Sequence, residues 1–297
     1  MENKRVRFIK RMLIALPIIL SFIAVILSAL ALWGIFDINR RLKSVSLNSY
    51  VEQTLVSNNY IVEEEEGKGD EAHAGDDAAP SGETKDTQDH IKVYLTFDDG
   101  PSVNTEKILD ILKKHNVKAT FFVNGTVSQY PEYLALYKRI TDEGNGIAMH
   151  SYSHKYEEIY SSEEAFEADL DKIHSLIYNE TGVDSKVYRF PGGSGNTVSK
   201  VPMESFAKIL HDRGYEYYDW NIYPGDRSGR SYPKDMIVSS ILDNIYEYRS
   251  AIILLHDSDN HVTTVEALPE VIEGLLARDC EFCLMDENTP VIQQVAY

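Results

Sequence analysis

Hydrophobic and polar positions follow three successive patterns along the chain. Residues 13–36 form 24 consecutive positions without a formal charge, rich in Leu, Ile and Ala. Residues 51–90 show no apolar period, and from residue 91 short apolar runs alternate with helical periods. A helix rises about 1.5 Å per residue, so the first run exceeds the roughly 20 residues that span the hydrocarbon of a membrane. We predict a transmembrane helix at residues 13–36, a flexible linker at 37–90 and a folded domain at 91–297.

The charges that flank the apolar run set its expected orientation. Five Lys and Arg side chains lie within residues 1–12, whereas only three follow within residues 37–50. Because positive charge marks the cytoplasmic side, residues 1–12 are predicted to lie in the cytoplasm and the folded domain outside the cell membrane. The alternative is a secreted protein whose signal peptide is cleaved at the small-x-small site of residues 29–31. The apolar residues that continue to Phe36 favour an uncleaved anchor.

From residue 91, the spacing of apolar positions predicts a repeated strand-then-helix order. The expected strands are Val93–Phe97, Ala119–Asn124, Gly146–His150, Val187–Phe190, Tyr215–Trp220, Ala251–His256 and Glu281–Met285. The expected helices are Thr105–His115, Pro131–Glu143, Glu163–Asn179, Pro202–Arg213, Pro233–Tyr248 and Val265–Arg278. This alternation indicates parallel strands in βα units. We expect an α/β fold built as a distorted (β/α) barrel, with a doubly wound open sheet as the alternative.

The amino-acid composition excludes some classes of binding partner and some kinds of structural site. The chain has 297 residues with 43% hydrophobic positions, enough for a sizeable core. Its formal net charge of −18 argues against nucleic-acid binding, which needs a surplus of Lys and Arg. Twelve acidic and two basic side chains in residues 51–90 indicate a self-repelling linker. The two cysteines, Cys280 and Cys283, make neither a disulfide framework nor a four-cysteine zinc site.

Side chains able to do chemistry gather at the carboxyl ends of the expected strands. In parallel α/β architectures these ends face one way and carry the active site, so residues distant in sequence converge on one rim. This placement predicts an enzyme. The residues so placed are Asp98, Asp99, His150, His154, Arg189, Asp219, Trp220 and His256.

Two short segments, residues 98–99 and 150–154, are together predicted to form a metal site. Asp98 and Asp99 repel each other unless a cation or proton separates their roles, so we expect one to bind a metal and the other to accept a proton. The Gly-Pro pair at residues 100–101 ends the strand and lets both face one site. His150 and His154, four apart, would share a face of a helical turn. Two histidines and one carboxylate suit zinc hydrolysis or non-haem Fe(II) oxygenation, and the second carboxylate favours hydrolysis.

Two further residues complete the expected site. His256 follows a fully apolar run, and at the carboxyl end of a strand it is well placed to donate a proton to a leaving group. Arg189 can hold a carboxylate in place. The glycines that follow it, Gly192 and Gly193, let backbone N–H groups approach a developing oxyanion.

The chain resembles a known family through the segments Thr96-Phe97-Asp98-Asp99-Gly100 and His150-Ser151-Tyr152-Ser153-His154. It is similar to the NodB-homology polysaccharide deacetylases, carbohydrate esterase family four, over residues 91 to about 286. The resemblance implies a distorted (β/α) barrel that removes N-acetyl or O-acetyl groups from polysaccharides with Zn²⁺, or another divalent metal such as Co²⁺ or Mn²⁺. It also implies a role for each matching residue. Asp98 would be the catalytic base, oriented by Arg189, and His256 would be the general acid. The metal ligands would be Asp99, His150 and His154, while the Gly192 N–H would bind the oxyanion and Leu254 would line an acetyl pocket.

Two positions depart from the family pattern. Gly192 stands where the third motif often has an aromatic residue, and Tyr223 where an acid usually supports the catalytic histidine. Asp219 or Asp226 would then supply that support. Trp220 and Tyr223 are also candidates for a platform on which a sugar stacks.

An external anchor and spacer suit a substrate fixed at the cell envelope. We therefore expect hydrolysis of N-acetyl groups in peptidoglycan N-acetylglucosamine, with no nucleic acid and no protein partner. Alternatives are deacetylation of chitooligosaccharide, poly-N-acetylglucosamine or acetylxylan, and a non-catalytic glycan-binding protein of the same fold. Hydrolysis of small amides fits an external anchor poorly.

Overall fold

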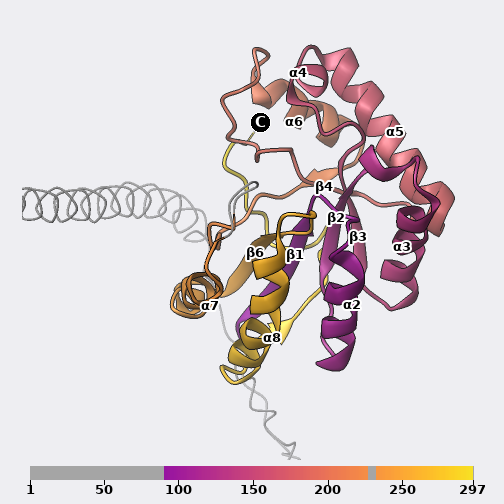
Figure 1. Ribbon diagram of the computed structural model, residues 1–297. Helices are drawn as coiled ribbons and strands as arrows, with labels where there is room; N and C mark the ends of the chain where they lie inside the picture. The colour runs from indigo at the N-terminus through magenta and orange to yellow at the C-terminus, as the bar shows by residue number, and fades with distance from the viewer. Residues whose placement is uncertain (1–89, 227–231, 297) are drawn as a thin grey trace, which may run out of the picture. The chain divides into compact units, whose positions relative to one another are not determined.

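The computed structural model describes residues 90–226 and 232–296, in which helices surround a parallel sheet (Figure 1). The strands are β1 (Lys92–Asp98), β2 (Thr120–Asn124), β3 (Gly146–Ser151), β4 (Val187–Tyr188), β5 (Glu216–Tyr217), β6 (Ser250–His256) and β7 (Glu281–Phe282). The helices are α2 (Thr105–Lys114), α3 (Pro131–Asp142), α4 (Tyr156–Ile159), α5 (Glu163–Thr181), α6 (Met203–Asp212), α7 (Lys234–Leu242) and α8 (Val262–Leu276), with 3-10 turns at Gly125–Val127 and Ile245–Glu247.

The anchor predicted at residues 13–36 lies outside the described residues, as does the linker predicted at 37–90 apart from its last residue. Both stay predictions, and so do the domain boundaries drawn from them. Within the described part of the chain, no helix combines the length and apolar character that crossing a membrane requires.

The sheet is curled into a half-barrel, which confirms the expected α/β fold with parallel strands. Its strand order is β5-β4-β3-β2-β1-β6, and β7 pairs with β1. Every ladder is parallel. No ladder joins β5 to β6 in the described residues; a single bridge between Ile222 and Ile253 connects the segment after β5 to β6.

The side chains of β1 alternate between two separate apolar clusters. Val93, Leu95 and Phe97 belong to the large apolar cluster shared with the surrounding helices, whereas Tyr94 belongs to a small second cluster. Successive side chains of a strand point to opposite faces, so Thr96 and Asp98 continue the row of Tyr94. On this face of β1, the apolar cluster around Tyr94 lies toward the amino end of the strand, and the Asp98 carboxylate lies at its carboxyl end.

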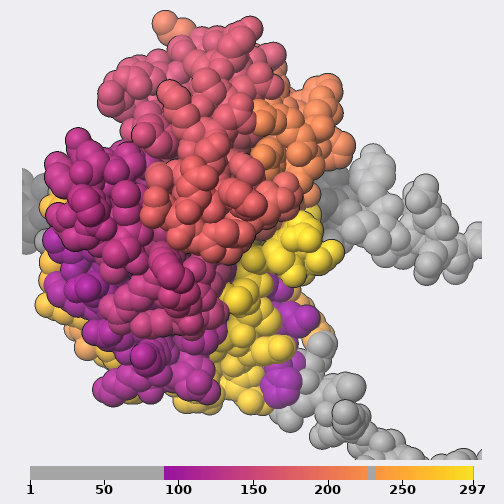
Figure 2. Space-filling model, turned by 90° about the vertical axis from the view of Figure 1, so that its right-hand side faces the viewer, coloured from indigo at the N-terminus to yellow at the C-terminus, as the bar shows by residue number. Residues whose placement is uncertain are grey.

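The C-terminal segment after β7 covers this second cluster. Met285 donates its N–H to the Thr120 hydroxyl at 3.0 Å, and the Asp219 N–H donates to the Ile292 carbonyl at 2.8 Å. In the space-filling view, the yellow C-terminal residues lie beside the salmon segment that precedes α6 (Figure 2). The end of the chain thus fixes the backbone just after β5, where part of the site begins.

Some element boundaries differ from those expected, for local reasons. The helix predicted at 233–248 ends at Leu242, because Asp243 and Asn244 are poor helix formers; the Asn244 amide donates to the Ser240 carbonyl at 2.7 Å. The short helix α4 was not predicted at all. Strands β4, β5 and β7 are shorter than expected.

Candidate active site

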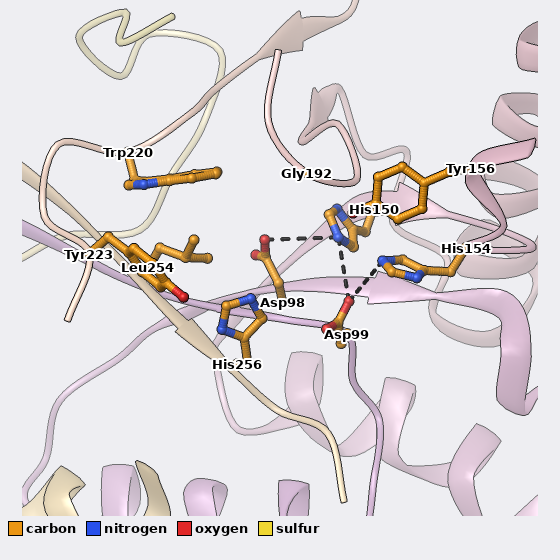
Figure 3. A pocket seen from close by; sticks show the side chains of 10 residues that line it. All are labelled: Asp98, Asp99, His150, His154, Tyr156, Gly192, Trp220, Tyr223, Leu254 and His256. Carbon is orange, nitrogen blue, oxygen red and sulfur yellow. Dashed lines mark ion pairs between the residues drawn. The ribbon is translucent and has the colours of Figure 1, made fainter. Parts of the chain in front are cut away.

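The carboxyl ends of β1, β3 and β6 open into one pocket of about 330 Å³ (Figure 3). Its shape follows from strand register, because Asp98 is the β-sheet partner of His256 in the β1–β6 ladder. The lining residues are Asp98, Asp99, His150, His154, Tyr156, Gly192, Trp220, Tyr223, Leu254 and His256. All except Tyr156 are residues that sequence reasoning selected, while Arg189, Asp219 and Asp226 lie behind the walls.

Adjacent carboxylates face the same pocket because the strand ends between them. Asp98 is the last residue of β1, and Asp99 has φ +76, a left-handed conformation that non-glycine residues rarely adopt. The Asn124 side chain holds this turn by donating to the Asp99 carbonyl at 2.8 Å. The change in backbone direction brings Asp99 to the side of the pocket that carries the histidines.

Asp99, His150 and His154 bring three potential ligand atoms together. Asp99 Oδ1 lies 3.5 Å from His150 Nε2 and 3.0 Å from His154 Nε2, drawn as dashed lines in Figure 3. This oxygen is buried, yet neither contact has hydrogen-bond geometry and no other described residue provides a partner. Two imidazole nitrogens and one carboxylate oxygen are a ligand set that Zn²⁺ uses when a position stays open for water or substrate. The residues present therefore fit a divalent cation.

The charges of this group reinforce one another. Burial alone would raise the pKa of the Asp99 carboxyl, but the two imidazoles outweigh it and hold the pKa well below its usual range. Burial would lower the pKa of His154, and the Asp99 carboxylate raises it instead. Asp99 is thus an anion at neutral pH, as a metal ligand must be.

A hydrogen bond on the far side of its ring orients His150. Its Nδ1 lies 2.7 Å from the Arg189 carbonyl, which can only accept, so Nδ1 carries the proton. The other ring nitrogen, Nε2, is left to face Asp99. Metal-binding histidines are commonly oriented in this way.

The expectation of a helical turn between the two histidines is wrong. His150 lies in β3, and His154 follows in a loop with φ +51. Asp169 of α5 anchors that loop: its carboxylate accepts from the Ser151 hydroxyl at 2.7 Å and from the N–H groups of Tyr152 and Ser153 at 2.8 and 2.9 Å. The anchored loop, and not helical periodicity, brings His154 back over the strand.

Sequence reasoning did not select Asp169. A signal was present, because Asp169 lies among the buried positions of α5 beside Leu170 and between Phe166 and Ile173. A carboxylate buried on the apolar face of a helix needs donors, and here the loop that carries the histidines supplies them.

Arg189 is fully buried and is bonded on every side. Its Nη1 donates to Asp98 Oδ1 at 2.8 Å and to the Thr96 hydroxyl at 2.7 Å. Nε and Nη2 donate to the carbonyls of Tyr218 and Asp219 at 3.0 and 3.1 Å. Its guanidinium carbon also lies 4.0 Å from the centre of the Phe122 ring. The guanidinium therefore fixes the Asp98 carboxylate in one orientation and balances its charge.

Asp226, and not Asp219, contacts His256. The His256 Nδ1–H donates to Asp226 Oδ1 at 2.9 Å, and Asp226 Oδ2 accepts from the His256 N–H at 3.0 Å and from the Thr264 hydroxyl at 2.9 Å. The Asp219 carboxylate instead accepts from Ser194 and from the Gln294 N–H. Burial would lower the pKa of His256, but Asp226 raises it to about 9. His256 is therefore an imidazolium at neutral pH.

His261 supports His256 from the other side. The two rings stack with centroids 5.0 Å apart and planes 18° apart, and His261 Nδ1 lies 2.7 Å from the Ser258 hydroxyl. Burial, followed by the nearby His256, lowers the pKa of His261. Ligand atoms of His256, His261 and Asp226 come within 4.8 Å of one another. Imidazole lone pairs lie in the ring planes, so these nearly parallel rings do not aim at a common ion.

A tight turn presents the Gly192 N–H to the pocket. The Gly193 N–H closes the turn on the Phe190 carbonyl at 2.8 Å, and Gly192 has φ +81, as the third residue of a type II turn requires. No described residue accepts a hydrogen bond from the Gly192 N–H. On the side of the pocket away from His150 and His154, Leu254 and two aromatic rings, Trp220 and Tyr223, form the other wall (Figure 3).

Comparison with known proteins agrees with this geometry. A model of the polysaccharide deacetylase family matches residues 85–217. The chain is 33% identical to a peptidoglycan-N-acetylglucosamine deacetylase of Bacillus cereus over 193 residues, which cover 64% of this chain and 67% of the relative. The crystal structure of the catalytic domain of peptidoglycan N-acetylglucosamine deacetylase from Eubacterium rectale aligns with a TM-score of 0.66 and 34% identity, over 75% of this chain and 98% of that one.

A third relative is a CE4 family pseudoenzyme from Bacillus anthracis. It aligns with a TM-score of 0.55 and 26% identity, over 65% of this chain and 63% of that one. Overall similarity thus extends to a protein described as a pseudoenzyme, and activity must be argued from the site itself.

Proposed function

The chain belongs to the polysaccharide deacetylase family, and on that premise we propose that it removes N-acetyl groups from peptidoglycan N-acetylglucosamine. As a member, it is a hydrolase of the carbon–nitrogen bond in N-acetyl groups. One observation carries the proposal: a single pocket holds the Asp99, His150 and His154 set together with Asp98 and His256.

Asp99, His150 and His154 would hold the divalent metal, which we propose is Zn²⁺, with Co²⁺ or Mn²⁺ as substitutes. When bound, such a cation acts as a Lewis acid that polarises an amide carbonyl and makes water a stronger nucleophile.

The remaining residues handle protons and charge. Asp98, fixed by Arg189, accepts a proton from water as the new carbon–oxygen bond forms. The Gly192 N–H donates to the carbonyl oxygen as it becomes negative. His256, charged through Asp226, gives its Nε2 proton to the amine nitrogen as the carbon–nitrogen bond breaks. The products are acetate and a free amine on the sugar.

The other wall of the pocket suits an acetylated sugar. Leu254 is buried and apolar, which fits the methyl group of an acetyl. Trp220 and Tyr223 lie with ring centroids 6.2 Å apart and offer faces for a pyranose ring. Alternative glycans differ in the sugar presented to this wall, and only a direct comparison of substrates separates them.

The test is acetate release by the full-length chain from purified peptidoglycan, chitooligosaccharide, poly-N-acetylglucosamine and acetylxylan, with added Zn²⁺. We expect the highest kcat/KM on peptidoglycan. Asp98→Asn should abolish release, while Asp212→Asn, which changes an exposed carboxylate of α6, should not. Acetate release by wild type and Asp98→Asn that is equal and no higher than the enzyme-free background would instead favour a non-catalytic glycan-binding protein.

We also propose that residues 13–36 anchor the enzyme in the cell membrane with the catalytic domain outside. The support is the uncharged run of 24 residues preceded by basic residues. Membrane fractionation should recover the full chain with the membranes and a chain lacking residues 1–36 in the soluble fraction. Cleavage near residue 31, seen as a shortened mature protein, would contradict an anchor.

A further inference from the structure

Helix α4 places an aromatic ring over Gly192. A Cβ atom added to Gly192 would lie 3.0 Å from both Cε1 and Oη of Tyr156, closer than side chains normally approach. The φ of +81 at Gly192 independently disfavours any side chain there. An aromatic side chain at position 192 would therefore clash, and the Tyr156 ring occupies the space beside Gly192.

A second tyrosine of the same segment holds the adjoining peptide. The Tyr160 hydroxyl donates to the Pro191 carbonyl at 2.8 Å, and the Tyr156 and Tyr160 rings contact each other with centroids 5.9 Å apart. Tyr160 is buried, whereas Tyr156 is half-buried and lines the pocket. The two tyrosines thus have different positions. Tyr160 holds the Phe190–Gly193 turn through the Pro191 carbonyl, and Tyr156 lines the pocket.

Tyr156 also lies across the pocket from the other aromatic residues. In Figure 3 its ring stands on the side of His150 and His154, while Trp220 and Tyr223 stand on the opposite side, with Asp98 between them. Its ring meets the edge of His154 at a centroid distance of 5.8 Å and an angle of 86°. A ring in this place lines the same pocket as Asp98 and is not part of the Asp99, His150 and His154 set.

We propose that Tyr156 is a specificity-determining residue that forms the second aromatic wall for the acetylated pyranose. This role rests on the proposed deacetylase function. A pyranose has apolar C–H faces that aromatic rings cover well, and burying them between Tyr156 and the Trp220 side strengthens binding of the sugar. The contact is the same before and during the reaction, so it acts on KM and not on kcat.

The experiment compares full-length wild type, Tyr156→Ala, Tyr156→Phe and the control Tyr246→Ala. Tyr246 is an exposed tyrosine in the 3-10 turn Ile245–Glu247 and does not line the pocket. For each protein, kcat and KM are measured for acetate release from chitotetraose, together with the Zn²⁺ dissociation constant and hydrolysis of 4-nitrophenyl acetate, an ester without a sugar. Each variant is also placed in an Asp98→Asn background for direct measurement of the chitotetraose Kd.

We expect Tyr156→Ala to raise the KM and Kd for chitotetraose about tenfold, equivalent to ~1.4 kcal/mol. Its kcat, Zn²⁺ affinity and ester hydrolysis should stay within about twofold of wild type, as should all values for Tyr156→Phe and Tyr246→Ala. An unchanged KM and Kd, a parallel loss of ester hydrolysis, or weakened Zn²⁺ binding in Tyr156→Ala would overturn the role. A wild type that binds chitotetraose through Tyr156 yet releases no acetate would reject the proposed function and leave this inference standing.

Discussion

The proton on His256 depends on one carboxylate, so replacing Asp226 with Asn makes a quantitative test of the acid. Asp226 accepts the Nδ1–H of His256 at 2.9 Å, and this pairing raises the histidine pKa to about 9 despite burial. Asn keeps the size of the side chain and removes its charge. Burial then dominates, and we expect the pKa to fall to the ordinary value of 6.5 or below.

The size of the effect follows from these pKa values. A histidine donates a proton only when it is protonated, so activity present below its pKa is lost as the pH rises through it. At pH 7.5, a pKa of about 9 keeps about 97% of His256 charged, whereas a pKa of 6.5 leaves about 9%. Asp226→Asn should therefore lower kcat at pH 7.5 about tenfold or more, and move the alkaline limb of the profile to lower pH by about 2.5 units.

The assay is kcat for acetate release from chitotetraose between pH 5 and 11, with Zn²⁺ saturating. Asp219→Asn is the matched control, because that carboxylate bonds Ser194 and Gln294 and makes no contact with His256. Its alkaline limb should stay where the wild type has it. If Asp226→Asn also kept an alkaline limb near pH 9, the assignment of that limb to the Asp226–His256 pair would be refuted.

Three further variants and one treatment test the rest of the site. A chelator should abolish acetate release and added Zn²⁺, Co²⁺ or Mn²⁺ should restore it; activity that survives full metal removal would contradict the metal assignment. Asp169→Asn should weaken Zn²⁺ affinity about 10- to 100-fold by freeing the histidine loop, measured by competition with a chromophoric chelator, and unchanged affinity would show that the anchor is dispensable. Arg189→Lys should lower kcat about 100-fold with little change in KM, because one ammonium cannot meet the guanidinium's acceptors while fixing Asp98; an equal loss in KM would point to substrate binding. Gly192→Ala should lower kcat about 100-fold through loss of the oxyanion donor geometry, while circular dichroism stays unchanged; normal kcat would exclude that N–H.

Much of the fold and the grouping of the site followed from alternation and strand ends. Each expected strand has a counterpart in the structure, because β-branched and aromatic runs define strands strongly. The grouping of Asp98, His150 and His256 followed from a rule of topology that needs no side-chain detail. The roles assigned to these residues stay predictions until the variants above are measured.

Other features depend on backbone paths that local sequence does not encode. Whether Asp219 or Asp226 reaches His256 depends on how the chain turns after β5, where the C-terminal segment holds Asp219 to Gln294. Tyr156 lies on a helix of four residues, too short to give an apolar period. Asp169 acts across 16 to 18 residues of chain, through the Ser151 hydroxyl and two loop N–H groups that almost any residue type would supply.

The pairing of Asp98 with His256 across neighbouring strands separates chemistry from recognition. The two groups are one interstrand step apart, roughly 4.8 Å along a hydrogen-bonded ladder, so backbone pairing sets their spacing. The rings and turns around them come from α4, the turn after β4 and the segment after β5. None of these segments takes part in the β1–β6 pairing that holds Asp98 and His256. Evolution can therefore reshape which polymer enters, by changing these surrounding pieces, without retuning the pair of groups that moves protons.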